Sequence, residues 1–207
     1  MLTYEQNLAN DWQLALREGS MYFDNDSTVH KTLRRIAQRL EEIGVDYAIA
    51  GGMCVSRHGF QRFTQDVDVL VTPEGLTKLQ SSLEGLGYVR PFAASKNLRD
   101  AETGVRIDFI VSGQFPGEGK PGPIAFPVPN QVATVIDGIR FIDVAPLIEL
   151  KLASGQASHR GQDLFDVQGL IRMRSLPREL SEQIHPSLRE AYMRKWDDAQ
   201  KSAADDR

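Results

Sequence analysis

The sequence predicts an α+β fold in which a mixed β-sheet is flanked by helices and followed by a helical C-terminal part. Between residues 28 and 145, short apolar segments alternate with amphipathic segments of helical spacing. From Pro146 onward the apolar spacing is helical. This order indicates a central sheet with helices packed against it. We therefore expect an N-terminal helical extension (1–27), a core (28–145) and a C-terminal helical region (146–207).

The first helices are predicted from polar breaks and apolar spacing. Residues 3–18 are expected to be helical and to lead into a polar break at 19–27, where Ser27 or Thr28 can cap the next helix. That helix has apolar residues three and four positions apart, which form one stripe: Val29, Leu33, Ile36, Leu40 and Ile43. Gly44 is well suited to end it.

The following segments alternate between strands and helices. Expected strands cover 46–50, 66–71, 88–92, 105–111, 133–136 and 139–144. Expected helices cover 53–58, a segment from Pro73 to Gly87 with Leu76, Leu79, Leu83 and Leu86 on one face, and then 146–154, 160–174 and 186–200. A hairpin turn is expected at 102–104, and residues 112–130, which are rich in Gly and Pro, are expected to form a long loop.

Composition restricts the class of protein. The chain has 207 residues, of which 41% are hydrophobic and 25% charged, as is ordinary for a globular protein. The net charge of −4 argues against a protein that coats nucleic acid, although it is compatible with a local basic patch. Cys54 is the single cysteine, so no intramolecular disulfide can form. The first residues resemble no secretory signal and no apolar run is long enough to span a membrane, so we expect a cytoplasmic protein.

The segment 47–71 carries the strongest functional signal. A predicted buried strand ends at Gly51-Gly52, where a short helix is expected to begin. Backbone N–H groups at a helix N-terminus attract phosphate, and glycine lets the phosphate come close. A tight turn that needs a positive φ would explain the same two glycines, so this signal alone does not decide between the two interpretations.

Two carboxylates follow in the next predicted strand. Asp66 and Asp68 are two positions apart, so both side chains leave the same face, while the alternating valines mark the other face as core. Aspartate is depleted in strands, and like charges on one face repel each other. A divalent cation would remove the repulsion, and Mg²⁺ takes such oxygen ligands together with substrate phosphates. The alternative is a solvated strand face with two salt-bridged aspartates.

Asp108 interrupts the apolar strand that is predicted after the hairpin turn. If the two strands are neighbours, Asp108 lies beside Asp66 and Asp68. Three carboxylates suit a two-metal site for phosphoryl transfer, in which one ion activates the attacking hydroxyl and the other stabilises the leaving group. A carboxylate near that hydroxyl can also act as general base. The alternative is an edge-strand residue paired with Arg106 or Arg90.

The order Gly51-Gly52, then Asp66-x-Asp68, then Asp108 resembles the nucleotidyltransferase superfamily, which has the DNA polymerase β-like fold. The closer likeness is to small bacterial nucleotidyltransferases of the AbiEii type. Those families also show an Arg-x-Thr before the Asp-x-Asp, a Lys that opens a C-terminal helix, and a downstream Lys-Asp-x-x-Asp. The resemblance covers about residues 30–175, which is most of the chain.

This chain matches the additional motifs at five positions: Arg62, Thr64, Lys151, Asp163 and Asp166. The resemblance implies that Arg62 and Thr64 help to bind the nucleotide. It also implies that Lys151 neutralises charge on the triphosphate. Asp163 and Asp166 share a helix face and either orient Lys151 or Arg160 or are surface charges.

Two positions depart from the family pattern. Gly52 stands where many members have Ser, so backbone amides alone would contact the phosphates there. Gln162 stands where a Lys often precedes Asp163, which weakens the last motif.

The resemblance implies a nucleotidyltransferase that depends on Mg²⁺, with Mn²⁺ as the alternative ion, and moves a nucleoside monophosphate from an NTP to an acceptor. Acceptors in similar families include RNA or tRNA ends, proteins and small molecules such as antibiotics. A toxin that is paired with an antitoxin is one role of this kind. One alternative is a catalytically silent nucleotide-binding or regulatory module with the same fold, and another is an interaction protein in which the motifs are accidental.

The loop at 112–130 directly follows the strand that carries Asp108. This position makes the loop a hypothetical contact for the nucleotide base or the acceptor, through Lys120 or Phe115.

Overall fold

The computed structural model describes residues 2–156 and 160–205, and in that part of the chain the strands form one mixed sheet. The strands are β1 (Tyr47–Ile49), β2 (Asp66–Val71), β3 (Tyr88–Val89), β4 (Leu98–Asp100), β5 (Arg106–Val111), β6 (Ala133–Ile136) and β7 (Ile139–Ile142). Their order across the sheet is β3-β4-β5-β2-β1-β7-β6. The pairs β1–β7 and β2–β5 are parallel, and the other neighbours are antiparallel.

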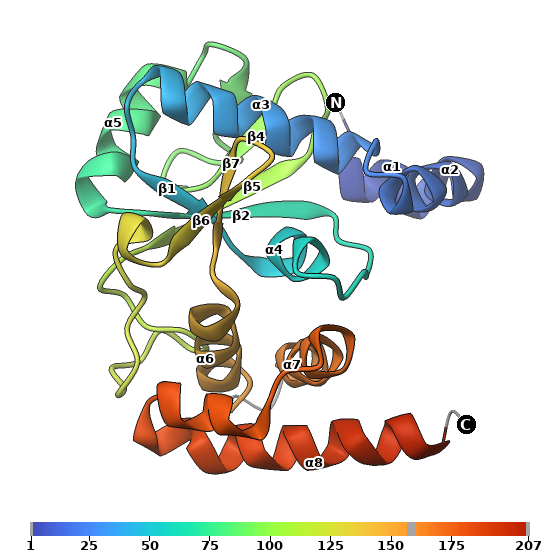
Figure 1. Cartoon of the computed structure of the whole chain (residues 1–207). Helices are drawn as coiled ribbons and strands as arrows, with labels where there is room; N and C mark the ends of the chain where they lie inside the picture. The colour runs from blue at the N-terminus through green and yellow to red at the C-terminus, as the bar shows by residue number, and fades with distance from the viewer. Residues whose placement is uncertain (1, 157–159, 206–207) are drawn as a thin grey trace.

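Helices cover both sides of this sheet. They are α1 (Tyr4–Asn10), α2 (Trp12–Phe23), α3 (Thr28–Glu42), α4 (Gly51–Arg57), α5 (Pro73–Leu83), α6 (Val144–Ser154), α7 (Gly161–Arg174) and α8 (Arg189–Asp205), with short 3-10 turns η1 (Pro129–Gln131), η2 (Arg178–Gln183) and η3 (Pro186–Leu188). In Figure 1, α3 lies above the sheet, whereas α4 and the C-terminal helices lie below it. The prediction of a mixed sheet flanked by helices, with a helical C-terminal part, is therefore confirmed.

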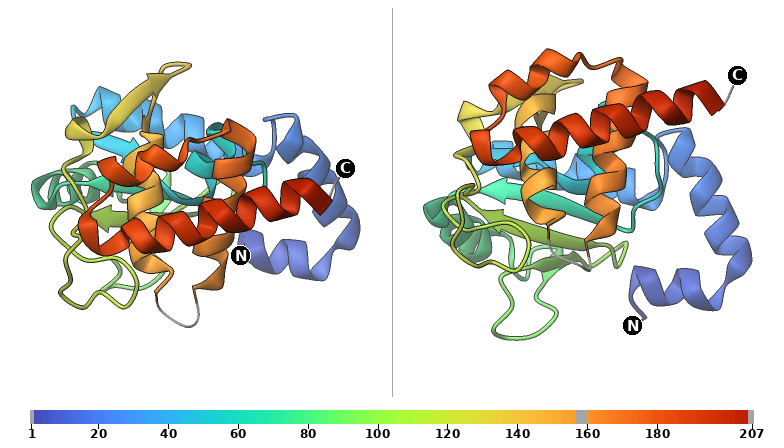
Figure 2. Two further views of the ribbon diagram at one scale, coloured as in Figure 1. Left: turned by 60° about the horizontal axis from the view of Figure 1, so that its bottom comes forward. Right: turned by 90° about the horizontal axis from the view of Figure 1, so that it is seen from below.

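The C-terminal helices form a layer of their own. Figure 2 shows α8 running across α6 and α7, and α8 packs directly against α7. None of the described helices has both the length and the apolar character needed to cross a bilayer.

The amphipathic spacing of α3 explains how it joins the sheet. Ser27 caps the helix by accepting a hydrogen bond from the backbone N–H of His30, as the sequence predicts. The apolar stripe faces the core, where Val29, Ile36 and Leu40 are fully buried. Burial of this stripe stabilises the packing of α3 on the sheet, on the face opposite the C-terminal helices.

The N-terminal extension differs from the prediction in its helices. The single helix expected at 3–18 is wrong, because Asp11 ends α1 and its carboxylate caps α2 by accepting from the N–H of Leu14. Helix α2 then continues to Phe23, so the polar break is shorter than expected. Tyr4, Leu8 and Tyr22 belong to the same buried core as the sheet.

Three smaller expectations also need correction. Helix α5 ends at Leu83 because Glu84 is extended, which leaves Leu86 outside the helix and 71% exposed. The strand expected at 88–92 is limited to Tyr88–Val89. Strand β4 was not predicted, since two of its three residues are charged and it offers no alternation of apolar residues.

Candidate functional site

Three carboxylates and one guanidinium share a face of two neighbouring parallel strands. In the β2–β5 pair, Asp66 lies opposite Arg106 and Asp68 lies opposite Asp108. Because alternate strand residues leave the same face, the four side chains form a two-by-two set, which we call the carboxylate array. The structure therefore brings together the three aspartates singled out from the sequence. Asp108 is not an edge residue, since β5 lies between β4 and β2.

Arg106 is the cation within the carboxylate array. Its Nη2 donates a hydrogen bond to Asp66 Oδ2 at 2.9 Å, and its Nε lies 3.2 Å from Asp108 Oδ2. The second contact is an ion pair without hydrogen-bond geometry, because Arg106 Nε has no hydrogen-bond partner in the described residues. Asp108 Oδ1 is likewise buried there without a partner. Buried unpaired polar atoms are costly, so the protein alone does not satisfy this array.

Asp68 carries the largest electrostatic cost of the array. Its carboxylate makes no hydrogen bond or ion pair with the part of the chain that the structure describes, although its backbone carbonyl accepts from the N–H of Ala50. Burial, together with the charges of Asp66 and Asp108, raises the pKa of Asp68 to about 7. Burial and Asp66 also raise the pKa of Asp108, although Arg106 opposes the shift. The array thus holds more negative charge than one guanidinium neutralises.

Gly51 is required by its close approach to Asp68. Its φ is 56°, in the left-handed region, and a Cβ on it would lie 1.7 Å from Asp68 Oδ2. The glycine thus serves a tight turn and also leaves room for the carboxylate. Helix α4 begins at this turn, and its N-cap residue Ala50 provides no side-chain cap.

Gly52 is required by two other site residues. A Cβ on Gly52 would lie 2.8 Å from Thr64 Cβ and 3.2 Å from Arg62 Nη1. A serine would overlap these side chains, which explains in this structure why glycine replaces it. Thr64 Oγ1 donates to Asp66 Oδ1 at 2.7 Å, so Thr64 fixes the Asp66 carboxylate.

A second group of charges joins the C-terminal helices to the core. Lys151 Nζ lies 2.9 Å from Asp163 Oδ1 and 2.7 Å from Asp166 Oδ2. Arg62 donates to both oxygens of Asp166, from Nε at 2.6 Å and from Nη2 at 2.9 Å. We call Lys151, Asp163, Asp166 and Arg62 the lysine cluster. Its two carboxylates face two cations with short contacts.

Burial distinguishes the lysine cluster from surface charges. Lys151 is 6% exposed and Asp166 is fully buried. Burial alone would lower the pKa of Lys151, but Asp166 and Asp163 raise it. Burial alone would raise the pKa of Asp166, but Arg62 and Lys151 hold it below its ordinary value. Lys151 lies in the last turn of α6, as the helix expected at 146–154 predicts, and it does not open a helix as the lysine of the family pattern does.

The donor types of the carboxylate array fit a hard divalent cation. The unpaired Asp108 Oδ1 and the unpaired carboxylate of Asp68 are oxygen ligands of the kind that Mg²⁺ prefers. Their spacing in this structure does not form a metal site, since within 2–156 and 160–205 no group of three or more His, Cys, Asp or Glu residues is arranged to hold a metal ion. The guanidinium of Arg106 lies between Asp66 and Asp108 instead.

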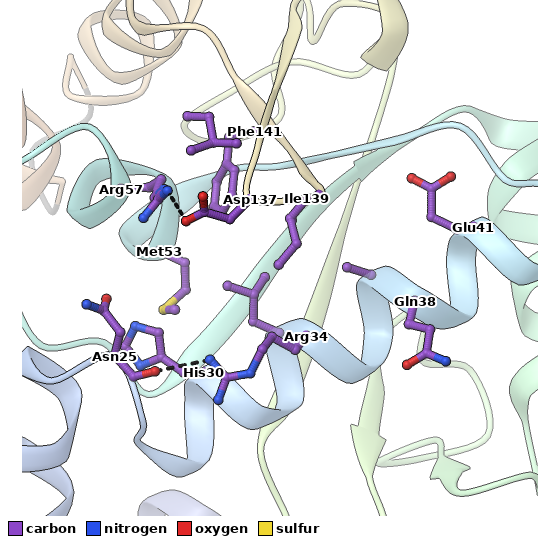
Figure 3. Close-up of a pocket in the computed structure, with 14 residues that line it drawn as sticks. Asn25, His30, Arg34, Gln38, Glu41, Met53, Arg57, Asp137, Ile139 and Phe141 are labelled. Atoms are coloured by element: carbon purple, nitrogen blue, oxygen red, sulfur yellow. Dashed lines mark hydrogen bonds and ion pairs between the residues drawn. The ribbon is translucent and has the colours of Figure 1, made fainter.

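A separate cavity of about 520 Å³ lies between α3, α4 and the β6–β7 hairpin. Figure 3 shows the charged side chains around it, and none of its lining residues belongs to the carboxylate array. Arg57 is paired with Asp137, and Arg34 donates to the carbonyl of Asn25 at 3.1 Å. Burial lowers the pKa of His30 to about 4, so its ring is neutral near pH 7. The cavity has volume, but its charged groups have partners within the protein.

Sequence reasoning missed the role of Arg106 and the partner of Arg62. Arg106 entered only as an ion-pair partner of Asp108, although its spacing of two from Asp108 places it on the same strand face. The Arg62–Asp166 contact joins residues 104 positions apart, so no local pattern could reveal it. In the 112–130 loop, Gly117 packs beside Ser154 of α6 and Lys120 pairs with Glu118, so a role in binding stays a prediction.

Comparison with known proteins supports the fold. No protein-family model matches the chain, and no curated protein matches it. The crystal structure of ANT(2")-Ia in complex with adenylyl-2"-tobramycin is similar, with a TM-score of 0.53, 15% identity, and coverage of 80% of this chain and 97% of that chain. The solution structure of the antibiotic-resistance factor ANT(2'')-Ia gives a TM-score of 0.52 at 14% identity, covering 84% and 96%.

A third similar structure is a nucleotidyltransferase-like protein from Paracoccidioides brasiliensis. It has a TM-score of 0.45 and 16% identity over 68% of this chain and 74% of that chain. The two ANT(2'')-Ia structures show that this chain shares their fold.

Proposed function

We propose that this chain is a Mg²⁺-dependent nucleotidyltransferase that moves a nucleoside monophosphate from an NTP to an acceptor and releases pyrophosphate. The observation that carries the proposal is the carboxylate array, in which three in-register carboxylates have one cation between them. The excess charge raises the pKa of Asp68 to about 7 and leaves Asp108 Oδ1 unpaired. A divalent cation would supply the missing positive charge, and Mn²⁺ is the alternative ion.

The residues of the array and of the glycine turn have distinct roles in this proposal. Asp66, Asp68 and Asp108 would hold the cation, and Thr64 fixes the orientation of Asp66. A bound cation would neutralise charge on the triphosphate and lower the pKa of the acceptor hydroxyl. The turn at Gly51-Gly52 presents backbone rather than side chain beside Asp68, which lets a phosphate approach.

The proposed reaction forms a bond between the acceptor oxygen and the α-phosphorus and breaks the bond to the bridging oxygen of pyrophosphate. The acceptor proton needs a base, and Asp108 suits that role because one of its oxygens has no partner in the described residues. The lysine cluster is connected to the array through Arg62, Gly52 and Thr64. Arg62 contacts Asp166, and Gly52 packs against both Arg62 and Thr64, so the cluster positions the strand that carries Asp66.

The acceptor is the least constrained part of the proposal. RNA or tRNA ends, proteins and small molecules are all retained as acceptor classes. The similar ANT(2")-Ia crystal structure contains adenylyl-2"-tobramycin, so aminoglycosides belong among the small molecules to be tested. We also retain the role of a toxin of the AbiEii type with an antitoxin partner. In that case, expression should slow bacterial growth, and the substitution pair Asp66→Ala/Asp68→Ala should relieve the effect.

The direct test incubates the protein with each of the four NTPs, labelled at the α-phosphate, and Mg²⁺. Total RNA, lysate protein and an aminoglycoside panel serve as acceptors. The matched variants are Asp66→Ala/Asp68→Ala and Asp46→Ala, the latter an exposed aspartate whose partner is Arg140. We expect label transfer by the wild type and by Asp46→Ala, and its loss by at least about 10³-fold in the double variant.

The outcomes of this test separate the alternatives. Equal transfer by the wild type and the double variant would contradict the proposal. Nucleotide binding without transfer to any acceptor would instead support a catalytically silent module. The absence of both binding and transfer would favour an interaction protein.

A further inference from the structure

The position of Arg106 has a consequence for how a cation reaches the site. Its guanidinium bonds to Asp66 at 2.9 Å and lies 3.2 Å from Asp108, and both carboxylates are proposed cation ligands. A guanidinium and a divalent ion therefore require the same oxygens. The strand register keeps the backbone of Arg106 beside Asp66, since the two residues are direct partners in the β2–β5 pair.

We propose that Arg106 is an internal counter-ion that competes with the divalent cation for Asp66 and Asp108 and moves away when the cation binds. This inference rests on the proposed function, because it assumes that the carboxylate array binds a cation. It assigns to Arg106 a positioning role, since the residue acts through the two aspartates. The competition would keep the affinity for the free ion low and favour binding of the ion together with its nucleotide.

The contacts of Arg106 allow such a movement. Its side chain is 42% exposed, so there is room for another rotamer without disruption of the core. Only one of its contacts to the array is a hydrogen bond, because Nε lacks a hydrogen-bond partner within the described chain. Arg106 is therefore held less strongly by Asp66 and Asp108 than Arg62 is held by its two hydrogen bonds to Asp166.

Release of the guanidinium would also benefit a bound triphosphate. Guanidinium donors match phosphate oxygens, and Arg keeps its charge at every working pH. An NTP that brings its own cation would thus supply both the ion that replaces Arg106 and a new anionic partner for it. We expect positive coupling between the ion and the nucleotide, and this coupling must be reciprocal.

The experiment measures Mn²⁺ affinity without nucleotide, by the loss of the free-ion signal in electron paramagnetic resonance, for the wild type and for Arg106→Gln. The matched control is Arg99→Gln, which removes an equal charge on the neighbouring strand, opposite Arg106. Arg99 bonds to Glu5 and to the carbonyl of Gly104, so it does not compete for the array. Both variants are first checked for a native circular dichroism spectrum.

We expect Arg106→Gln to bind Mn²⁺ at least about tenfold more tightly than the wild type, and Arg99→Gln to stay within about threefold. Arg106→Lys keeps the positive charge but loses the planar guanidinium, so its Mn²⁺ affinity should lie between those of Arg106→Gln and Arg99→Gln. This variant also tests the inference if Arg106→Gln does not fold. A non-hydrolysable NTP should tighten Mn²⁺ binding more in the wild type than in Arg106→Gln.

Two results would overturn the inference. Equal tightening in Arg106→Gln and Arg99→Gln would mean that only net charge matters, and unchanged affinity in Arg106→Gln would mean that no competition exists. In either case the proposed function still stands if label transfer depends on Asp66 and Asp68. If no variant binds Mn²⁺ and transfer does not depend on those aspartates, both the inference and the proposed function fail.

Discussion

The carboxylate array and the lysine cluster both combine aspartates with basic side chains, but they differ in how completely the carboxylates are paired. In the lysine cluster, Asp166 accepts short hydrogen bonds from Arg62 and lies 2.7 Å from Lys151, and its pKa is lowered despite burial. In the carboxylate array, burial raises the pKa of Asp68 to about 7, and Asp108 keeps an unpaired oxygen in the described structure. A complete cluster holds the fold together, whereas an incomplete one is suited to a ligand.

The two groups are also physically connected. Thr64 bonds to Asp66 of the array, Arg62 bonds to Asp166 of the cluster, and Gly52 packs against both residues. The short segment from Arg62 to Asp66 therefore links the C-terminal helices to the array, and its contacts help to fix the position of Asp66. A single substitution can perturb either group or the glycine between them.

The largest effect on stability is expected in the lysine cluster. Asp166→Asn should lower the free energy of unfolding by about 3 kcal/mol, because it leaves Lys151 and Arg62 partly unpaired in a buried place. Urea denaturation at pH 7 measures the loss. Asp163→Asn is the matched control, since it leaves the contacts between Arg62 and Asp166 intact and should cost clearly less. Equal losses in the two variants would show that Asp166 is not the centre of the cluster.

A smaller effect of opposite sign is expected in the carboxylate array. The pKa of Asp68 is raised from 3.8 to about 7 in the folded protein, so the stability it contributes is present below about pH 4 and is lost as the pH rises through 7. Asp68→Asn cannot ionise and should therefore be more stable than the wild type at pH 8, by on the order of 2 kcal/mol. Unfolding in EDTA at pH 4.5, 6 and 8 tests this. A difference that does not vary with pH would contradict the raised pKa.

The pH series, extended to pH 3, should change the stability of Asp166→Asn relative to the wild type in the other direction. The lowered pKa of Asp166 gives stability that is present above its ordinary pKa and is lost as the pH falls through its folded value. The deficit of Asp166→Asn should therefore shrink only in acid, below about pH 4. Matching pH profiles for the two variants would remove the distinction between the two groups.

The smallest effect is expected at the glycine between them. Gly52→Ala would place a Cβ 2.8 Å from Thr64 Cβ. Such overlap costs about 1–3 kcal/mol, and the better helix propensity of Ala returns up to about 1 kcal/mol, so we expect a net loss of about 1 kcal/mol. Gly161→Ala is the control, because nothing lies within 4 Å of a Cβ at that position. Equal thermal midpoints for the two variants would show that Gly52 is not tightly packed.

The sequence predicted most of the strands and the aspartates of the array, because both depend on local patterns. Alternation placed Asp66 and Asp68 on the strand face opposite the core, and Asp108 stood out as a lone carboxylate in an apolar strand. Apolar spacing identified α3. Local patterns do not show that β2 and β5 are neighbours, and the structure shows that they pair in parallel. The division at residues 27 and 145 stays a prediction, although α1 and α2 contribute to the common core.

What the sequence could not reveal depends on contacts between distant segments. The burial of Lys151 and its bonds to Asp163 and Asp166 follow from the packing of α6 on α7, not from any residue near Lys151. The place of Arg106 between Asp66 and Asp108 depends on the strand register, since a slip of one residue would turn it to the other face. These contacts determine which carboxylates are satisfied.

Mn²⁺ binding to Asp68→Asn and to Asp163→Asn tests the difference between the two groups most directly. Both variants remove one negative charge, but only Asp68 belongs to the carboxylate array. We predict that Asp68→Asn weakens Mn²⁺ binding by at least about tenfold, whereas Asp163→Asn leaves it within about threefold of the wild type. Equal Mn²⁺ affinity in the two variants, or an affinity of Asp68→Asn within about threefold of the wild type, would contradict the assignment of the cation to the carboxylate array.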